Sequence, residues 1–143
     1  MNVARILKDK GRTVATVSPE TSVKECIRLL AEKKIGAAVV CDDDRRVRGI
    51  ISERDIVRIL AADGSNALDT PVSAHMTKEV MTCVEHDTVD WLMEVMTSRR
   101  FRHLPVVESG RLSGIVSIGD VVKQRIALAD LEAASMREYI ATG

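Results

Sequence analysis

The chain carries one sequence pattern twice, and this duplication restricts the possible folds more than any other feature. Residues 47–57 align with residues 112–122, about 65 positions further on, and Gly, Ile, Ser, Asp and Val recur at matching places. Residues 35–40 align in the same way with residues 101–106. A duplication of this kind predicts two copies of one structural unit.

Each copy carries the same succession of hydrophobic patterns. A helix is predicted where apolar residues stand at positions i, i+3, i+4 and i+7. These residues are Val23, Cys26, Ile27 and Leu30 in the first copy, and Val89, Leu92, Met93 and Met96 in the second. Ser22 and Glu25 predict a capping box at the start of the first of these helices. Two apolar runs around a polar turn then predict an antiparallel hairpin, and a second helix starts near Glu53 or Ile118.

The predicted fold is α/β, more narrowly α+β, with two β-α-β-β-α repeats packed around a pseudo-twofold axis. A unit of about 50–60 residues buries too little surface to be stable alone, so the two copies are expected to share a core. The expected organisation is an N-terminal segment plus repeat 1 at residues 1–62, a linker at 63–75, repeat 2 at 76–126 and a C-terminal amphipathic helix at 127–143. That helical pattern has apolar residues at Val122, Ile126, Ala129, Ala133, Met136 and Ile140. It is expected to pack on the repeat pair or on a dimer mate.

The charge and the aromatic content exclude several classes of function. Lys and Arg number 21 and Asp and Glu number 21, so the formal net charge is zero, which argues against a general electrostatic grip on nucleic acid or on an anionic membrane. Aromatic residues make up 2% of the chain, too few for a platform that stacks bases. Three cysteines without a CxxC pair predict neither a disulfide framework nor a zinc site. The N-terminal charges interrupt any signal-peptide core, and we expect a cytoplasmic protein.

These motifs resemble tandem CBS domains, the repeat named after cystathionine β-synthase. The resemblance rests on Gly-Ile-Ile-Ser-x-x-Asp at 49–55, Gly-Ile-Val-Ser-x-x-Asp at 114–120, Arg-His-Leu-Pro-Val-Val at 102–107 and His-Met-Thr at 75–77, and it covers residues 12–126. It implies a regulatory module with two clefts that hold AMP, ADP, ATP or NAD(H), and less often S-adenosylmethionine. It also implies a homodimer, or a dimer of dimers, that passes its signal to a separate downstream protein.

The family motif places Asp55 and Asp120 at the nucleotide ribose. A carboxylate suits that role because it accepts two hydrogen bonds from vicinal hydroxyls. Ser52 and Ser117 stand three residues earlier, at predicted helix starts, where a hydroxyl and free N–H groups can hold a phosphate. Ser-x-x-Asp is also a capping box, so a purely structural role in helix capping stays an alternative.

Arg102 and His103 are the strongest candidate phosphate contacts in the second copy. Arginine offers a forked donor that is always charged, and the charge of histidine varies near neutral pH. The first copy has Gly36 and Ala37 at the matching positions, and Arg54 is expected to substitute there in part. The two clefts are therefore expected to be unequal.

The family places the adenine beside the first strand of each copy and the segment before the second strand. By position these residues are Thr16, Val17, Pro19, Ile35 and Ala37 in the first copy, and Thr82, Val84, Phe101 and Pro105 in the second. Core packing alone would account for the same residue types.

Nothing in the sequence predicts a catalytic or metal site. His75 and His86 stand in turn settings, no cysteine has the partners of a nucleophile, and no phosphate-binding loop of the hydrolase type is present. We expect a non-catalytic sensor of an adenine nucleotide. A protein-interaction scaffold with the same fold and no physiological nucleotide is the main alternative, and an enzyme or a DNA-binding regulator fits less well.

Overall fold

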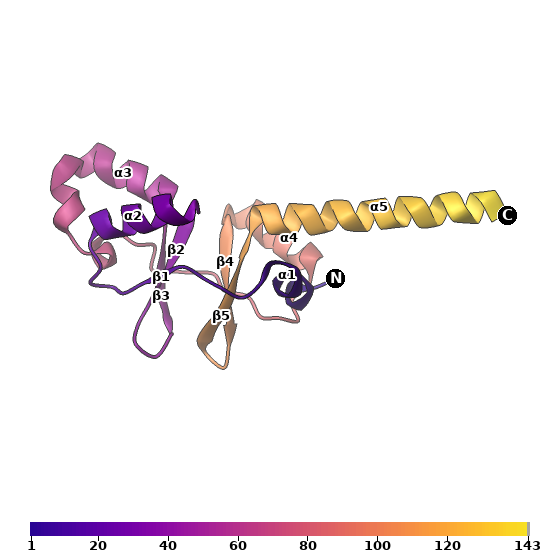
Figure 1. The fold of residues 1–143 in the computed structure, drawn as a ribbon, viewed down its shortest axis with the longest axis horizontal. Coiled ribbons are helices and arrows are strands. Elements are labelled where there is room, and N and C mark those ends of the chain that lie inside the picture. The colour runs from indigo at the N-terminus through magenta and orange to yellow at the C-terminus, as the bar shows by residue number, and fades with distance from the viewer. Residues whose placement is uncertain (143) are drawn as a thin grey trace.

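The structure is a computed structural model that describes residues 1–142 (Figure 1). The first repeat contains β1 (Thr16–Val17), α2 (Val23–Lys33), β2 (Ala37–Cys41), β3 (Val47–Ser52) and α3 (Glu53–Asp63). The second contains α4 (Val89–Arg99), β4 (His103–Glu108), β5 (Arg111–Ser117) and α5 (Ile118–Thr142). Helix α1 (Val3–Lys10) precedes both, and two 3-10 helices, η1 (Gly64–Asp69) and η2 (Val72–Ala74), lie between them. The predicted duplicated α/β fold is confirmed.

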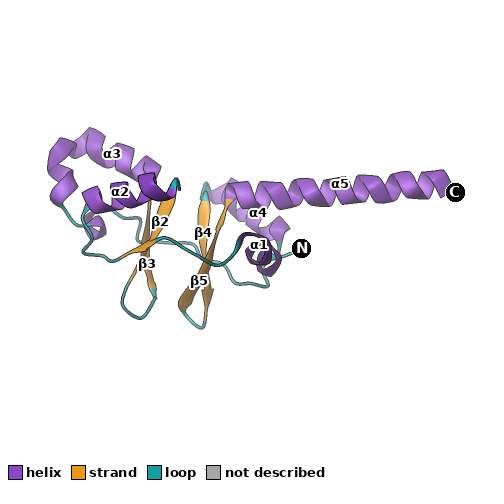
Figure 2. Cartoon of the chain, viewed as in Figure 1, coloured by secondary structure: helices purple, strands orange, loops and turns teal. Residues whose placement is uncertain are grey.

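The strands form two small sheets with matching topology. In the first, β1 runs parallel to β2 and β2 runs antiparallel to β3. In the second, β4 pairs antiparallel with β5, and a single parallel bridge between Cys83 and Val106 takes the place of β1. In Figure 2, α2 and α3 lie to the left of β2 and β3, and α1 and α4 lie to the right of β4 and β5, so the two hairpins stand between the helices of the two repeats. Val39 and Cys41 of the first hairpin pack with Leu112 of the second in a shared apolar cluster.

The helices begin where the sequence supplies caps. The Ser22 side chain accepts a hydrogen bond from the backbone N–H of Glu25, and Thr88 does the same for Trp91, each at 3.1 Å. These bonds satisfy N–H groups that the first helical turn leaves without partners. The far ends of α2 and α4 also correspond, because Lys34 and Arg100 both adopt the left-handed conformation. The duplication therefore extends to the helix ends.

Helix α1 packs into the core of the second repeat, although it precedes the first repeat in the chain. Val3, Ile6 and Leu7 are at most 2% exposed and join the cluster formed by α4, β4, β5 and the start of α5. The approach to β5 is close, because a Cβ added at Gly114 would lie 2.7 Å from a methyl carbon of Leu7. The assignment of residues 1–62 to one unit stays a prediction, and α1 lies spatially with the other.

Helix α5 runs without a break from Ile118 to Thr142 and projects beyond the rest of the molecule (Figure 1). Val121 and Gln124 are buried at its start, whereas Met136 and Ile140 are 63% and 73% exposed. The C-terminal part therefore does not pack on the repeat pair of its own chain. Among the described helices, none is both apolar enough and long enough to cross a lipid bilayer.

The three cysteines are expected to resist thiol reagents in the folded protein. Cys26, Cys41 and Cys83 are all buried, and burial raises the pKa of each thiol, to about 12 for Cys83, where Asp87 adds to the effect. Since the thiolate is the reactive form, titration with a chromogenic disulfide near pH 8 should detect almost no fast thiol in the native protein. The same titration in guanidinium chloride should detect three. Fast reaction of a native thiol would contradict the burial described here.

Candidate functional site

A pocket of about 320 Å³ opens where the two repeats meet. Its lining comes from the start of α3 and the strand before it, from the turn between α4 and β4, and from single residues before β2 and after η2. The residues are Gly36, Ile50, Ser52, Glu53, Arg54, Asp55, Arg58, Thr77, Arg100, Phe101, Arg102 and His103. The carboxylate candidate of the first copy and the cationic candidates of the second copy thus face one cavity.

Ser52 and Asp55 form a complete capping box at the start of α3. Asp55 Oδ2 accepts hydrogen bonds from Ser52 N at 2.8 Å and from Ser52 Oγ at 3.1 Å, and Asp55 N donates to Ser52 Oγ at 3.3 Å. Within residues 1–142, no hydrogen bond engages Asp55 Oδ1. Capping therefore occupies one carboxylate oxygen and leaves the other for a ligand.

Four arginines give the pocket its electrostatic character. Arg54 and Arg58 lie one turn apart on α3, while Arg100 and Arg102 come from the turn before β4. None of the four takes part in an ion pair within the described chain. The N-terminus of α3 adds partial positive charge beside them. The pocket as a whole is suited to an anion.

His103 lies between the pocket and the opposite side of the repeat interface. Burial is the main cause that lowers its pKa, and the positive charges of Lys10 and Arg102 lower it further, against the opposing effects of Asp120 and Glu53. A Cβ added at Gly36 would lie 3.7 Å from the imidazole Cε1. The imidazole is therefore mainly neutral at neutral pH in the free protein, and a larger residue at position 36 would crowd it.

The equivalent carboxylate of the second repeat is already engaged by an ammonium group. Lys10 Nζ donates to Asp120 Oδ2 at 2.7 Å and to the carbonyl oxygen of Ile115 at 3.1 Å. Burial alone would raise the pKa of Asp120, but the hydrogen bonds from Lys10 and from Ser117 outweigh it and lower the pKa. The two matching carboxylates therefore differ: Asp120 is paired with Lys10, whereas Asp55 faces a pocket that four arginines line.

The residues that the sequence assigned to the adenine lie in different parts of the structure. Of the nine adenine-pocket residues, Phe101 alone lines the described pocket at Asp55. Thr16 and Val17 form β1, Ala37 and Pro105 are buried within strands, and Thr82 and Val84 flank the bridging Cys83. Ile35 packs against the core of the first repeat. Ser117 caps α5 through Asp120 N at 3.2 Å.

Sequence reasoning missed several residues of the pocket. Ile50 and Thr77 are joined by a pair of backbone hydrogen bonds at 2.9 and 3.0 Å, which brings the linker end to the edge of β3. Thr77 lies at the cavity because of these two backbone hydrogen bonds to β3, which no pattern in the sequence indicates. Arg58 could have been found, because it stands four residues after Arg54 and so shares its helical face.

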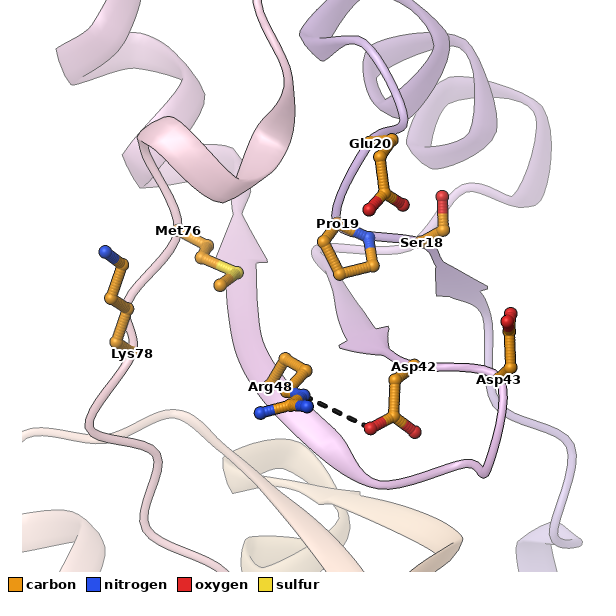
Figure 3. Close-up of a pocket in the computed structure, with 8 residues that line it drawn as sticks. All are labelled: Ser18, Pro19, Glu20, Asp42, Asp43, Arg48, Met76 and Lys78. Carbon is orange, nitrogen blue, oxygen red and sulfur yellow. Dashed lines mark hydrogen bonds and ion pairs between the residues drawn. The ribbon is translucent and has the colours of Figure 1, made fainter.

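A second hollow, of about 480 Å³, lies between the segment after β1, the hairpin of β2 and β3, and the chain at residues 76–78 (Figure 3). Its charged residues are Glu20, Asp42, Asp43, Arg48 and Lys78. Arg48 is paired with Asp42 at 3.2 Å, which leaves two carboxylates and one ammonium group around an open depression. Pro19, an adenine candidate, lies here and not in the pocket at Asp55. The surplus of carboxylates makes this hollow unsuited to a phosphate.

Comparison with known proteins identifies relatives by sequence and by structure. A crystal structure of a CBS-domain containing protein from Agrobacterium tumefaciens is 51% identical with a TM-score of 0.84, over 87% of this chain and 99% of that one. A 17.7 kDa protein of Acidianus ambivalens is 40% identical over 77% of this chain. This match spans 66% of the length of that relative. An inosine-5'-monophosphate dehydrogenase from Aquifex aeolicus is 37% identical over 77% of this chain, and the match spans 22% of the dehydrogenase.

Two further relatives have been solved with ligands. A CBS domain protein from Pyrobaculum aerophilum, complexed with AMP, is 28% identical with a TM-score of 0.79, over 93% of this chain and 99% of that one. The CBS domain pair of protein MJ0100, in complex with 5′-methylthioadenosine and S-adenosyl-L-methionine, is 26% identical with a TM-score of 0.78, over 89% of this chain and 97% of that one. The family model described as CBS domain matches residues 6–62 and 72–126. The repeat, its two-sheet fold and these matches agree, and the chain belongs to the CBS domain family.

Proposed function

We propose that the chain binds an adenine nucleotide in the pocket at Asp55 and acts as a non-catalytic regulatory module. The proposal rests on one cavity that is lined by Asp55 and by four arginines. Asp55 uses only Oδ2 in capping, and none of the four arginines forms an ion pair within the described chain. A ribose monophosphate has both features that such a cavity would recognise, namely vicinal hydroxyls and a dianion. The relatives solved with AMP and with adenosine compounds support the same class of ligand.

In this proposal the ribose hydroxyls donate to Asp55 Oδ1. The phosphate lies at the N-terminus of α3, near Ser52, where backbone N–H groups and the helix dipole favour an anion. Arg54 and Arg102 supply charged hydrogen bonds to it. Ile50, Thr77 and Phe101 provide the apolar and backbone surface for the adenine. AMP, ADP, ATP and NAD(H) share these groups, while the sulfonium cation of S-adenosylmethionine would be repelled by the arginines.

The cleft at Asp120 is proposed to be the weaker site. A ligand there would compete with Lys10 for the same carboxylate, and the free arginines line the other cavity. The expected stoichiometry is one nucleotide per chain at moderate concentration. Binding would shift a homodimer between two states, to the extent that its affinity for the two differs, and a downstream protein would respond to that shift.

Thermal unfolding with AMP, ADP, ATP, NAD⁺, NADH and S-adenosylmethionine tests this function. A ligand at about 100 times its dissociation constant should stabilise the native protein by about 2.7 kcal/mol. No shift with any of these ligands, together with no nucleotide found by mass spectrometry in the denatured protein, would favour the scaffold alternative. Release of a chemically altered nucleotide would instead indicate an enzyme.

The affinity for AMP is expected to rise as the pH falls from about 7.5 to about 6. His103 has a lowered pKa in the free protein, and a phosphate close to it would stabilise the protonated form and raise that pKa. Binding would then take up a proton, so a lower pH favours the complex. Calorimetric titration at several pH values measures this dependence. His103→Gln should remove most of it, because the remaining pH dependence belongs to the phosphate itself. An unchanged dependence in that variant would place the phosphate away from His103.

A further inference from the structure

The outer face of α5 carries an apolar stripe that continues past the body of the molecule. The stripe consists of Val122, Ile126, Ala129, Ala133, Met136 and Ile140, and we call it the α5 seam. Successive members are spaced by four and three residues in strict alternation, which is the a and d pattern of a coiled coil. Val122, Ile126, Met136 and Ile140 are 41%, 57%, 63% and 73% exposed.

The seam is not the face that α5 turns toward its own repeat. The buried or half-buried positions of α5 are Asp120, Val121, Gln124 and Leu128, and at 100° per residue they lie on another side of the helix. Leu131, which is 64% exposed, lies opposite the seam. All six seam residues are exposed, and the helix that carries them extends from the body of the molecule to its projecting end (Figure 1).

Charged residues flank the seam in an order that selects one pairing. In a parallel pair of helices, each g position faces the e position five residues later on the partner. Counting Ile126 as an a position, this places Arg125 opposite Asp130 and Glu132 opposite Arg137, so both pairs attract. In a fully overlapping antiparallel pair, Lys123 would face Arg137, Asp130 would face Asp130 and Glu132 would face Glu132. All three of those pairs repel.

We propose that the α5 seam binds a second copy of this chain as a parallel two-stranded coiled coil. The inference rests on the homodimer in the proposed function and adds its contact surface and its direction. Small residues at Ala129 and Ala133 allow the two helices to approach closely in the middle, and longer side chains pack at both ends. Arg125 also pairs with Asp90 of its own chain at 3.1 Å, so Glu132 and Arg137 form the cleaner test of the charge pairing.

Sedimentation velocity over a concentration series tests the surface. The double variant Ile126→Asp/Met136→Asp should raise the dissociation constant of the dimer by at least about tenfold, because each carboxylate would be buried without a partner. Leu131→Asp is the matched control, since it places the same charge on the opposite side of the same helix and should leave the dimer intact. A dimer that survives the double variant unchanged, or a native chain that stays monomeric, would overturn the proposal.

Two further variants test the direction. Ala133→Cys should form an intermolecular disulfide under mild oxidation, because a parallel pair brings residue 133 next to its own copy, while Leu131→Cys should not. Arg137→Glu should weaken the dimer, and Glu132→Arg/Arg137→Glu should restore it. A persistent dimer without the crosslink and without this rescue would overturn the parallel arrangement.

The nucleotide site is tested separately on the same samples. Asp55 lies on the first repeat and the seam lies on α5, so AMP should still raise the melting temperature of the double seam variant. Loss of the dimer with a retained AMP shift would support the seam and leave the nucleotide site standing. If the native chain dimerises through the seam but AMP does not raise its melting temperature, the nucleotide site is rejected and the seam stands.

Discussion

Replacing Leu7 with alanine is expected to lower the free energy of unfolding by about 2–5 kcal/mol, the usual range for a buried leucine. Leu7 is 1% exposed and packs in the second repeat with Leu92, Leu104 and Val116. For a chain of this size, such a loss corresponds to a fall in melting temperature of about 5–15 °C. Denaturant unfolding measures the free energy, and calorimetry the temperature. Leu131→Ala, at an exposed position of α5, is the control and should change both values little.

The contact between Leu7 and Gly114 allows this prediction to be tested as a coupled pair. Gly114→Ala alone is expected to cost about 1–3 kcal/mol, because the new methyl group would overlap a leucine that has no room to move. In Leu7→Ala/Gly114→Ala the overlap is gone, so the double variant should lose less than the sum of the two single losses. Gly119→Ala is the control, since its nearest neighbour is Ser117 Oγ at 3.6 Å. Strictly additive losses would show that α1 does not pack on β5 as described.

Replacing Asp55 with alanine is expected to weaken AMP binding by about 10- to 100-fold, because a charged hydrogen bond to each ribose hydroxyl would be lost. The variant also loses the half of the capping box in which Asp55 Oδ2 accepts from Ser52, so its own stability should fall, while the bond from the residue 55 N–H to Ser52 Oγ can remain. The quantity to compare is therefore the rise in melting temperature that AMP causes, measured within each variant. Isothermal titration supplies the dissociation constants directly.

Asp120→Ala is the matched control for this prediction. It removes the same motif residue from the other repeat, together with the hydrogen bond that its carboxylate accepts from Ser117 N and the ion pair with Lys10. Its own stability should fall, yet the AMP-induced shift should remain. If Asp120→Ala removes the shift and Asp55→Ala keeps it, the nucleotide lies in the second cleft, and the free arginines at Asp55 have another role.

The elements of this fold could be predicted from the sequence because their causes are local. Residues 38–41 and 47–51 are two short apolar runs with β-branched residues on either side of a polar turn, and they fall within β2 and β3. Ser22 lies three residues before the N–H group that it caps. The same locality explains a partial failure, since the leading strand of the second repeat is reduced to one bridge at Cys83. A strand that short leaves no periodicity to detect.

The arrangement of the site could not be predicted, because it depends on how the two copies pack. The sequence grouped Arg102 and His103 with the second copy, whereas the structure places them opposite Ser52 and Asp55 of the first. No spacing rule connects residues from different copies across their interface. The ion pair between Lys10 and Asp120 joins positions 110 residues apart, and neither residue signals the other along the chain.

The position of α1 has a consequence for the way the protein is made. Helix α1 is synthesised before both repeats, but its packing partners lie on α4, β4, β5 and α5, so Val3, Ile6 and Leu7 stay uncovered until the second repeat has emerged from the ribosome. Domains normally fold in order of synthesis, but the core of the second repeat here includes a helix that is made before the first repeat. We therefore expect nascent chains that end before residue 111 to be protease-sensitive at α1, and the completed chain to unfold in a single cooperative transition.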